Sequence, residues 1–196
     1  MVLDNGRVTT LAAPSVGIVL AAGAGTRYGM PKALARMPDG TPWLELVCVA
    51  LWEGGCDEVI VVLGARAEEA ARVVPDGARS VVATAWQSGL SASTRAGLDA
   101  AGDADAQAAI VVPVDVPGMP SAVVTRVRAS IGGADALARA VYDGSPGHPV
   151  LLGRHHWRPL GRRLAGDSGA RRYLEAEGAQ LIECGDLWDG HDVDTR

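Results

Sequence analysis

The sequence lacks phenylalanine, contains only three cysteines and has no long run of apolar residues. Cys48, Cys56 and Cys184 are odd in number and have no C-x-x-C spacing, which argues against a secreted disulfide scaffold and favours reduced thiols in a cytoplasm. No apolar run reaches the roughly 18 residues that a membrane helix needs. Residues 1–14 lack the cationic start and apolar middle of a signal peptide. We therefore expect a cytoplasmic protein with no membrane partner.

Clusters of positive charge are also missing. The chain has 18 cationic and 23 acidic residues, a formal net charge of -5. Nucleic acids and anionic membranes bind clustered Lys and Arg, so we expect no nucleic-acid partner and favour small molecules. Lys32 is the only lysine among the 18 cations. This position is informative because an ammonium is a compact point charge, whereas a guanidinium is a planar fork.

The 196 residues, 48% of them apolar, are enough for one domain with its own core. Short β-branched runs alternate with helical patterns, which predicts an α/β fold with a mostly parallel, Rossmann-like sheet and helices on both faces. We expect this domain over residues 15–196 and a flexible N-terminal arm over residues 1–14. The expected strands are 16–20, 58–63, 80–83, 108–112, 136–141, 149–152 and 180–183, and the expected helices are 43–53, 67–74, 91–100, 121–130 and 169–177.

The loop after the first strand is the strongest candidate for a site, since ligands of such sheets bind outside the carboxyl ends of the strands. Residues 17–34 read GIVLAAGAGTRYGMPKAL. The loop contains Gly23, Gly25, Gly29, Arg27 and Lys32. Glycines let main-chain NH groups approach an anion, and two cations add positive charge. The combination predicts a polyphosphate site; the alternative is a plain strand-to-helix turn with solvated charges.

Two common phosphate-binding loops do not fit the spacing. A Walker A loop requires Gly-Lys followed by Ser or Thr, but Met30 and Pro31 separate Gly29 from Lys32. A Rossmann GxGxxG loop requires glycine at the position of Tyr28.

The segment instead resembles the LAAGxGxRxGxPK signature of the molybdenum cofactor nucleotidyltransferases, which transfer a nucleoside monophosphate. The resemblance implies a fold like that of the nucleotide-diphospho-sugar transferases. It also implies that Arg27 and Lys32 are catalytic: they grip the triphosphate and offset the charge of the departing pyrophosphate. The implied nucleotide-binding residues are Leu20, Ala21, Ala22, Gly23, Gly25, Thr26, Arg27, Lys32, Gly89 and Ser93.

Carboxylates follow at two further places. Asp115 ends the strand run IVVPV beside the expected polyphosphate loop, which suits Mg²⁺, although Asp before a Pro-rich turn is also an ordinary turn former. The last residues read HDVDTR, which taken alone suits either a metal site or a solvated acidic tail. These segments resemble the family's Asp-x-Pro and DIDT motifs. The resemblance implies that Asp115 is catalytic. It also implies that Asp115 and Asp194 are the metal ligands, with Asp192 close by.

Three further segments resemble family motifs. Trp86, Gly89 and Ser93 match Trp-x-x-Gly-x-x-x-Ser, but Ala83 and Thr84 stand where relatives commonly carry Asn. His148 and Pro149 match the HPV motif of the acceptor pocket, and Arg171 lies in a loop-to-helix segment that also resembles the family. His148 either contacts the acceptor or braces its turn. Arg171 either neutralises substrate phosphate or is a solvated helix charge.

The resemblance extends from residue 16 to 195 and implies a Mg²⁺-dependent enzyme of the cytidylyl branch. LAAG at residues 20–23 favours CTP over GTP, with a molybdopterin-type acceptor and a molybdoenzyme or its chaperone as further partner. Two alternatives stay open. One is an NAD(P)H-dependent oxidoreductase of the nicotine blue type, because a Gly-rich loop holds pyrophosphate in either case. The other is a molybdenum cofactor binder without catalysis.

Overall fold

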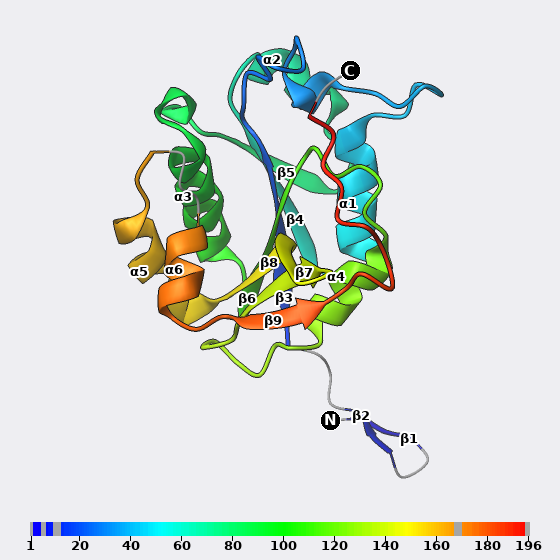
Figure 1. The fold of residues 1–196 in the computed structure, drawn as a ribbon, viewed down its shortest axis with the longest axis vertical. Helices are drawn as coiled ribbons and strands as arrows, with labels where there is room; N and C mark the ends of the chain where they lie inside the picture. The colour runs from blue at the N-terminus through cyan, green and yellow to red at the C-terminus, as the bar shows by residue number, and fades with distance from the viewer. Residues whose placement is uncertain (1, 5–6, 10–12, 167–169, 195–196) are drawn as a thin grey trace.

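The computed structural model describes residues 2–4, 7–9, 13–166 and 170–194. Most of them surround a seven-stranded sheet with the strand order β5-β4-β3-β6-β8-β7-β9 (Figure 1). A separate antiparallel hairpin precedes it, formed by β1 (Val2–Asp4) and β2 (Arg7–Thr9). The strands of the large sheet are β3 (Ser15–Ala21), β4 (Glu58–Leu63), β5 (Ala78–Val82), β6 (Ala108–Pro113), β7 (Leu137–Tyr142), β8 (Ser145–Gly153) and β9 (Gln180–Glu183).

The sheet is mostly parallel, as its sequence pattern predicts. Strands β5, β4, β3 and β6 run parallel to one another, and β9 runs parallel to β7. Only β8 is antiparallel to its neighbours, β6 and β7. All seven residues of β3 are buried, which is typical of a parallel strand covered on both faces.

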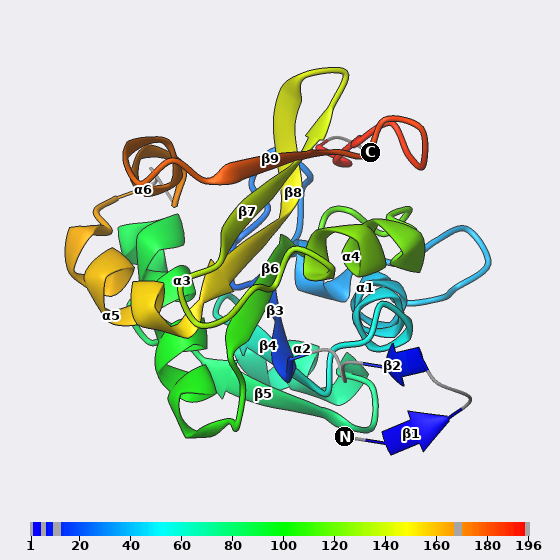
Figure 2. The ribbon, with the colours of Figure 1, turned by 90° about the horizontal axis from the view of Figure 1, so that it is seen from below.

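Helices cover both faces of this sheet (Figure 2). The helices α1 (Trp43–Glu53) and α4 (Ser121–Arg128) pack on one face, and α3 (Leu90–Ala100), α5 (Arg154–Arg163) and α6 (Arg171–Ala176) on the other. Short helical turns complete the fold: α2 (Ala67–Ala70), η1 (Lys32–Leu34), η2 (Ala71–Val73), η3 (Trp86–Ser88) and η4 (Ala101–Asp103). None of the helices in the described ranges is long and apolar enough to cross a membrane. The α/β fold class is confirmed.

Helix α5 is the longest helix that the sequence pattern does not predict. Its ten residues include Pro159 and no acidic residue in the first turn, and a proline inside a helix removes one hydrogen bond. Tertiary packing forms it nevertheless, because Trp157 and Leu160 are buried against the sheet. The indole of Trp157 also donates a hydrogen bond of 2.8 Å to the carbonyl of Leu152.

Two other expectations concern segments at the edge of the described chain. The expected helix 169–177 is α6 over Arg171–Ala176, and Gly169 lies outside the described residues. Residues 1, 5–6 and 10–12 of the expected N-terminal arm also lie outside them. The flexibility of residues 1–14 stays a prediction.

The strand order reverses at β3. From β3 the chain adds β4 and β5 on one side and then returns to place β6 on the other. The amide of Val114 donates to the carbonyl of Leu20 at 3.1 Å, so the carboxyl ends of β3 and β6 lie side by side. Ligands of doubly wound sheets bind at such a reversal, and the loops after Leu20 and Pro113 both leave from it.

Helix α3 packs unusually close to the sheet because residue 97 has no side chain. A Cβ atom at Gly97 would lie 2.7 Å from Cγ2 of Ile18 and 3.0 Å from Cγ2 of Val62. Both neighbours are β-branched and fully or almost fully buried, so they have little room to move. This close approach places the first turn of α3 beside the carboxyl end of β3.

We predict opposite effects from two helical Gly→Ala substitutions. Gly161→Ala in α5 meets no atom within 4 Å and should raise the free energy of unfolding by up to about 1 kcal/mol through helix propensity. Gly97→Ala should lower it by about 1–3 kcal/mol through overpacking. Urea unfolding of both variants measures the difference. Equal stabilisation by both substitutions would contradict the close packing of α3.

Candidate active site

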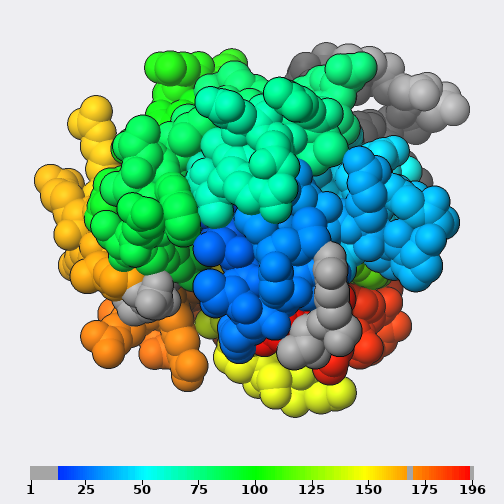
Figure 3. Space-filling model, turned by 90° about the horizontal axis from the view of Figure 1, so that it is seen from above, coloured from blue at the N-terminus to red at the C-terminus, as the bar shows by residue number. Residues whose placement is uncertain are grey.

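A cavity of about 530 Å³ opens at the carboxyl ends of β3 and β6, a size that suits a small-molecule ligand. Figure 3 views the molecule from this end, with the segment after β3 at the centre and the C-terminal segment beside it. All ten residues expected to bind nucleotide line the cavity, together with Asp115. The remaining lining residues are Ala24, Tyr28, Ala33, Trp86, Gln87, Leu90, Pro113 and Val114.

The loop after β3 needs glycine at position 25. Gly25 has a φ of +62°, and a Cβ atom there would lie 1.9 Å from the carbonyl oxygen of Met30. The amide of Gly29 donates to the carbonyl of Gly25 at 2.8 Å, so the loop folds back on itself. Any side chain at Gly25 would open this turn and move the residues that follow, including Lys32.

Lys32 connects this loop to two carboxylates. Its Nζ lies 2.9 Å from Oδ2 of Asp115 and 2.9 Å from Oδ1 of Asp194. Burial of the Lys32 ammonium lowers its pKa, but the hydrogen bonds and charges of the two carboxylates outweigh this, and the net pKa is raised. The hydrogen bond and charge of Lys32 in turn lower the pKa of Asp194. Lys32 and Asp194 are therefore both charged at neutral pH.

Arg27 lies at the outer edge of the same cluster. Its Nη1 is 3.3 Å from Oδ2 of Asp194, and its side chain is 78% exposed. An exposed pair of this kind adds little stability. Arg27 is therefore free to exchange the carboxylate for an anionic ligand at small cost.

Three carboxylates meet beside Lys32. Asp115, Asp192 and Asp194 each offer an oxygen, and these oxygens lie within 4.8 Å of one another. Oδ1 of Asp115 is buried and has no hydrogen-bond partner in the described part of the chain, which is costly for a carboxylate oxygen. Carboxylate oxygens are the ligands that Mg²⁺ and Mn²⁺ prefer. The donor set and the orphaned oxygen both fit a divalent cation.

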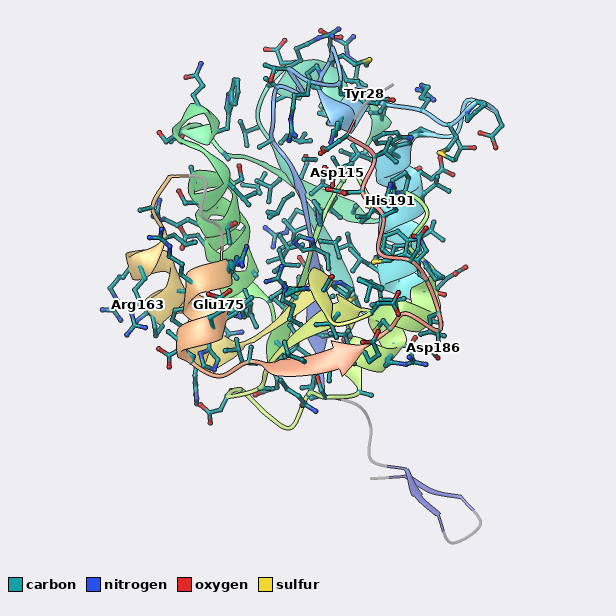
Figure 4. The ribbon with its side chains drawn as sticks, viewed as in Figure 1. Tyr28, Asp115, Arg163, Glu175, Asp186 and His191 are labelled. Atoms are coloured by element: carbon teal, nitrogen blue, oxygen red, sulfur yellow. The ribbon has the colours of Figure 1, made fainter. Side chains whose placement is uncertain are left out.

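The C-terminal segment reaches this cluster after leaving β9, the strand at one edge of the sheet. After β9 it runs up along α1 (Figure 1), and Figure 4 shows the stretch that carries His191 close to Asp115. The amide of Val193 donates to the carbonyl of Asp115 at 2.8 Å. Gly190 packs on Tyr142, where a Cβ atom would lie 2.3 Å from the ring. These contacts hold Asp192 and Asp194 at the end of β6.

The wall of the cavity next to α3 is equally tight. Gly64 follows β4, and a Cβ atom there would lie 2.5 Å from the carbonyl oxygen of Ala22 and 2.7 Å from Cγ of Trp86. Gly89 precedes α3 with a φ of +101°, a conformation that disfavours other residues. Both glycines let the Trp86 ring approach the loop after β3.

The three residues expected to bind the acceptor are not among those that line the cavity. Pro149 is buried, and Arg171 is 71% exposed and pairs with Glu175 at 2.9 Å. The carbonyl of His148 accepts a hydrogen bond of 2.5 Å from the hydroxyl of Tyr142. An acceptor role for these three residues stays a prediction.

His148 is held in its neutral form. Burial lowers the pKa of its imidazole to about 4, and the charge of Arg139 acts in the same direction while that of Asp192 opposes it. A neutral imidazole donates or accepts a hydrogen bond but carries no charge. If His148 contacts a ligand, it does so without attracting it electrostatically.

Sequence reasoning passed over several residues of this site. Asp192 completes the carboxylate trio but was expected only to lie close to it, and Tyr28, Gln87 and Leu90 were not expected at the cavity. The one feature of the sequence that indicates a role for Asp192 is its position two residues before Asp194. A second hollow of about 750 Å³ lies between α3 and α5, but it shares no residue with the carboxylate cluster.

We predict that His148 makes stability fall in mild acid. Its pKa in the folded protein, about 4, lies below the ordinary value near 6.5, so the unfolded chain binds the proton first. This contribution is fully present above pH 6.5 and is lost as the pH falls from 6.5 toward 4, by about 1–3 kcal/mol. Urea unfolding of the wild type and of His148→Gln at pH 7.5 and 4.5 measures it. Equal losses in both proteins would contradict burial of neutral His148.

Three comparisons place this geometry among known proteins. Residues 17–181 match the model of the MobA-like NTP transferase domain. The nicotine blue oxidoreductase of Paenarthrobacter nicotinovorans is 37% identical over 190 residues, which cover 91% of each chain. A homolog of Mycobacterium tuberculosis Rv0371c from Mycobacterium sp. strain JC1 has a similar structure, with a TM-score of 0.77, 29% identity and coverage of 92% of this chain and 90% of that one.

A further similar structure contains a metal. It is the complex of Rv0371c from Mycobacterium tuberculosis H37Rv with manganese, with a TM-score of 0.68, 25% identity and coverage of 87% of this chain and 86% of that one. The family model spans the glycine-rich loop, Lys32 and Asp115, so the match includes most of the site described above. The chain belongs to the family of MobA-like NTP transferase domains.

Proposed function

We propose that this chain is a Mg²⁺-dependent nucleotidyltransferase that moves CMP from CTP onto the phosphate of a molybdopterin-type acceptor and releases pyrophosphate. The observation that carries the proposal is the position of Lys32. Its ammonium lies within hydrogen-bonding distance of Asp115 and Asp194, on a loop that lines a cavity of suitable size. A cation, acidic residues and a glycine-rich loop are the components that nucleotidyl transfer needs.

The loop after β3 would bind the triphosphate. Gly23 and Gly25 line the cavity, so the amide groups of this loop can donate to phosphate oxygens. Arg27 is exposed and weakly paired, and it would turn from Asp194 to the triphosphate. Lys32 would lie against the same phosphates and offset charge on the leaving pyrophosphate.

Asp115 and Asp194 would hold the divalent ion, with Asp192 as a third oxygen donor. When bound, the ion supplies positive charge that stabilises the attacking and leaving oxygens of the transfer. The manganese complex of the similar protein Rv0371c supports this assignment. The acceptor's phosphate oxygen would attack the α-phosphorus, forming one P–O bond while the bond from the α-phosphorus to the pyrophosphate oxygen breaks.

The nucleotide and acceptor are inferred from the sequence motifs. Residues 20–23 read LAAG, which resembles the cytidylyl branch, and His148-Pro149 resembles its acceptor motif. The cavity lies where Leu20, Ala21 and Ala22 leave the sheet, so these residues would face the nucleotide. Arg171 would approach the acceptor from the start of α6.

A second candidate function has a specific observation in its favour. The nicotine blue oxidoreductase of Paenarthrobacter nicotinovorans is similar over 91% of both chains, so an NAD(P)H-dependent reduction of a dye-like substrate is the competing activity. Two features count against it. Tyr28 occupies the third glycine position of a Rossmann loop. Hydride transfer from a nicotinamide does not require a cluster of three carboxylates.

Pyrophosphate release distinguishes the two functions. The purified protein, Mg²⁺ and isolated molybdopterin are mixed with each of the four NTPs, and pyrophosphate is measured with a coupled enzyme assay. We expect release with CTP, less with GTP, and none without acceptor. NADPH oxidation with a quinone-like dye, together with no pyrophosphate from any NTP, would establish the oxidoreductase instead. CTP binding without either activity would indicate a cofactor binder.

Lys32→Ala should lower the rate of pyrophosphate release by about 10² or more, since a charge contact to the transition state is lost. Lys32→Arg should recover only part of the rate, because the planar guanidinium cannot occupy the position of an ammonium between two carboxylates. Arg72→Ala removes an exposed cation on η2 and serves as control. A rate for Lys32→Ala equal to that of the control would refute the assigned role.

Asp115→Asn should weaken Mn²⁺ binding at least about tenfold, because one charged ligand becomes neutral. Electron paramagnetic resonance of free Mn²⁺ measures the affinity directly. The control is Asp99→Asn, which neutralises an exposed carboxylate of α3. Removal of divalent ions by EDTA should abolish pyrophosphate release, and added Mg²⁺ should restore it. Full activity in EDTA would contradict the metal site.

A further inference from the structure

Arg139 occupies an inward-facing position of the sheet. It lies on β7 opposite Val150 of β8, and its chain neighbours Ala138 and Ala140 pack on the opposite face, against α1 and α4. Arg139 therefore shares the α3 face with Val150. Across the sheet, Val150 is paired with Val111, and Val111 with Ile18. An arginine thus continues a row of three buried apolar residues.

The charge of Arg139 has no counterion within ion-pair distance. Its Nε donates to the carbonyl of Gly147 at 3.0 Å, but none of the ion pairs found among the described residues involves its guanidinium. Burial lowers the pKa of Arg139, and the neighbouring positive charge of Arg171 lowers it further, while Glu175 opposes both. Glu175 is already bound to Arg171. A half-buried, uncompensated cation is costly, and a bound anion would remove that cost.

The register of the strands relates this cation to the proposed nucleotide site. Val111, in the same row, is two residues before Pro113, which lines the cavity. Two strand spacings separate β6 from β7, roughly 10 Å. Arg139 therefore lies on the same face of the sheet as Pro113, two strands away from it.

We propose that Arg139, assisted by Arg171, binds an anionic group of the second substrate, so that the acceptor lies on the α3 face of the sheet next to the nucleotide. The inference rests on the proposed function and adds a specificity-determining residue to it. A guanidinium offers two parallel N–H groups to a phosphate or carboxylate. Nε is held by Gly147, and no hydrogen bond joins the Nη groups to another of the described residues. A phosphate monoester is the class of ligand that these groups fit.

A structural role for Arg139 is the alternative. Its hydrogen bond to Gly147 braces the turn before His148, and loss of that bond alone would lower stability without changing ligand affinity. The two roles differ in their readouts. A binding role affects the affinity for a phosphate monoester but not that for the nucleotide, whereas a structural role affects thermal stability, or both affinities together.

The test measures binding of phenyl phosphate by isothermal titration calorimetry. The full chain is first saturated with Mg²⁺ and α,β-methylene-CTP, which fills the triphosphate loop and prevents turnover. Affinities are compared for the wild type, Arg139→Gln, Arg139→Lys and Arg171→Gln. Arg158→Gln, which neutralises an exposed arginine of α5, is the matched control. The affinity for α,β-methylene-CTP is measured separately for each protein.

We expect Arg139→Gln to weaken phenyl phosphate binding about tenfold or more, as the loss of a charged hydrogen bond predicts. Arg139→Lys should weaken it less, Arg158→Gln less than twofold, and nucleotide affinity should stay within twofold throughout. Should Arg139→Gln fail to fold, a loss with Arg139→Lys at unchanged nucleotide affinity supports the inference.

Two results overturn it: equal phenyl phosphate affinity in the wild type and both Arg139 variants, or no phenyl phosphate binding by a wild type that binds nucleotide. The latter leaves the proposed function standing. Absence of nucleotide binding by the wild type overturns the proposed function itself.

Discussion

The ion pairs of Lys32 are the interaction on which the rest of the site depends. Three carboxylates whose oxygens approach within 4.8 Å repel one another, and the only lysine of the chain lies at 2.9 Å from two of them. Lys32 can reach them because the loop after β3 folds back at Gly25. The Lys32 ammonium compensates the same carboxylate charges that a bound divalent ion would compensate.

Different parts of the fold position the cavity and the carboxylate cluster. The reversal of strand order at β3 brings the ends of β3 and β6 together, and the close contact of α3 at Gly97 closes one wall of the cavity. The carboxylate cluster needs the C-terminal segment, which Tyr142 and the carbonyl of Asp115 hold in place. The two acidic segments are far apart in the chain. They meet because β9 runs in the same direction as β7 and β6, so that the C-terminal segment leaves β9 at the edge of the sheet where β6 ends.

Family membership and reaction are separate conclusions for this chain. Its domain belongs to the MobA-like NTP transferases, yet a protein similar over nearly its whole length carries the name of an oxidoreductase. A glycine-rich loop after a buried strand binds pyrophosphate in a nucleotide or in a dinucleotide, because both present the same anion to the same amides. The carboxylate cluster separates the two chemistries, since it suits a divalent ion and not a nicotinamide ring.

The sequence alone determined the α/β class and all seven strands of the large sheet, because hydrophobic period and residue type are local properties. It also identified the glycine-rich loop and the acidic residues Asp115 and Asp194, whose binding roles stay predictions. The sequence pattern does not predict helix α5, because Pro159 disfavours a helix and only the burial of Trp157 against the sheet overrides that preference. Tertiary structure alone decided that Lys32 contacts both Asp115 and Asp194, that Asp192 joins them, and that Arg139 lies on the α3 face of the sheet. Each of these depends on which strands pair and where the C-terminal segment runs, and no spacing along the chain encodes such distances.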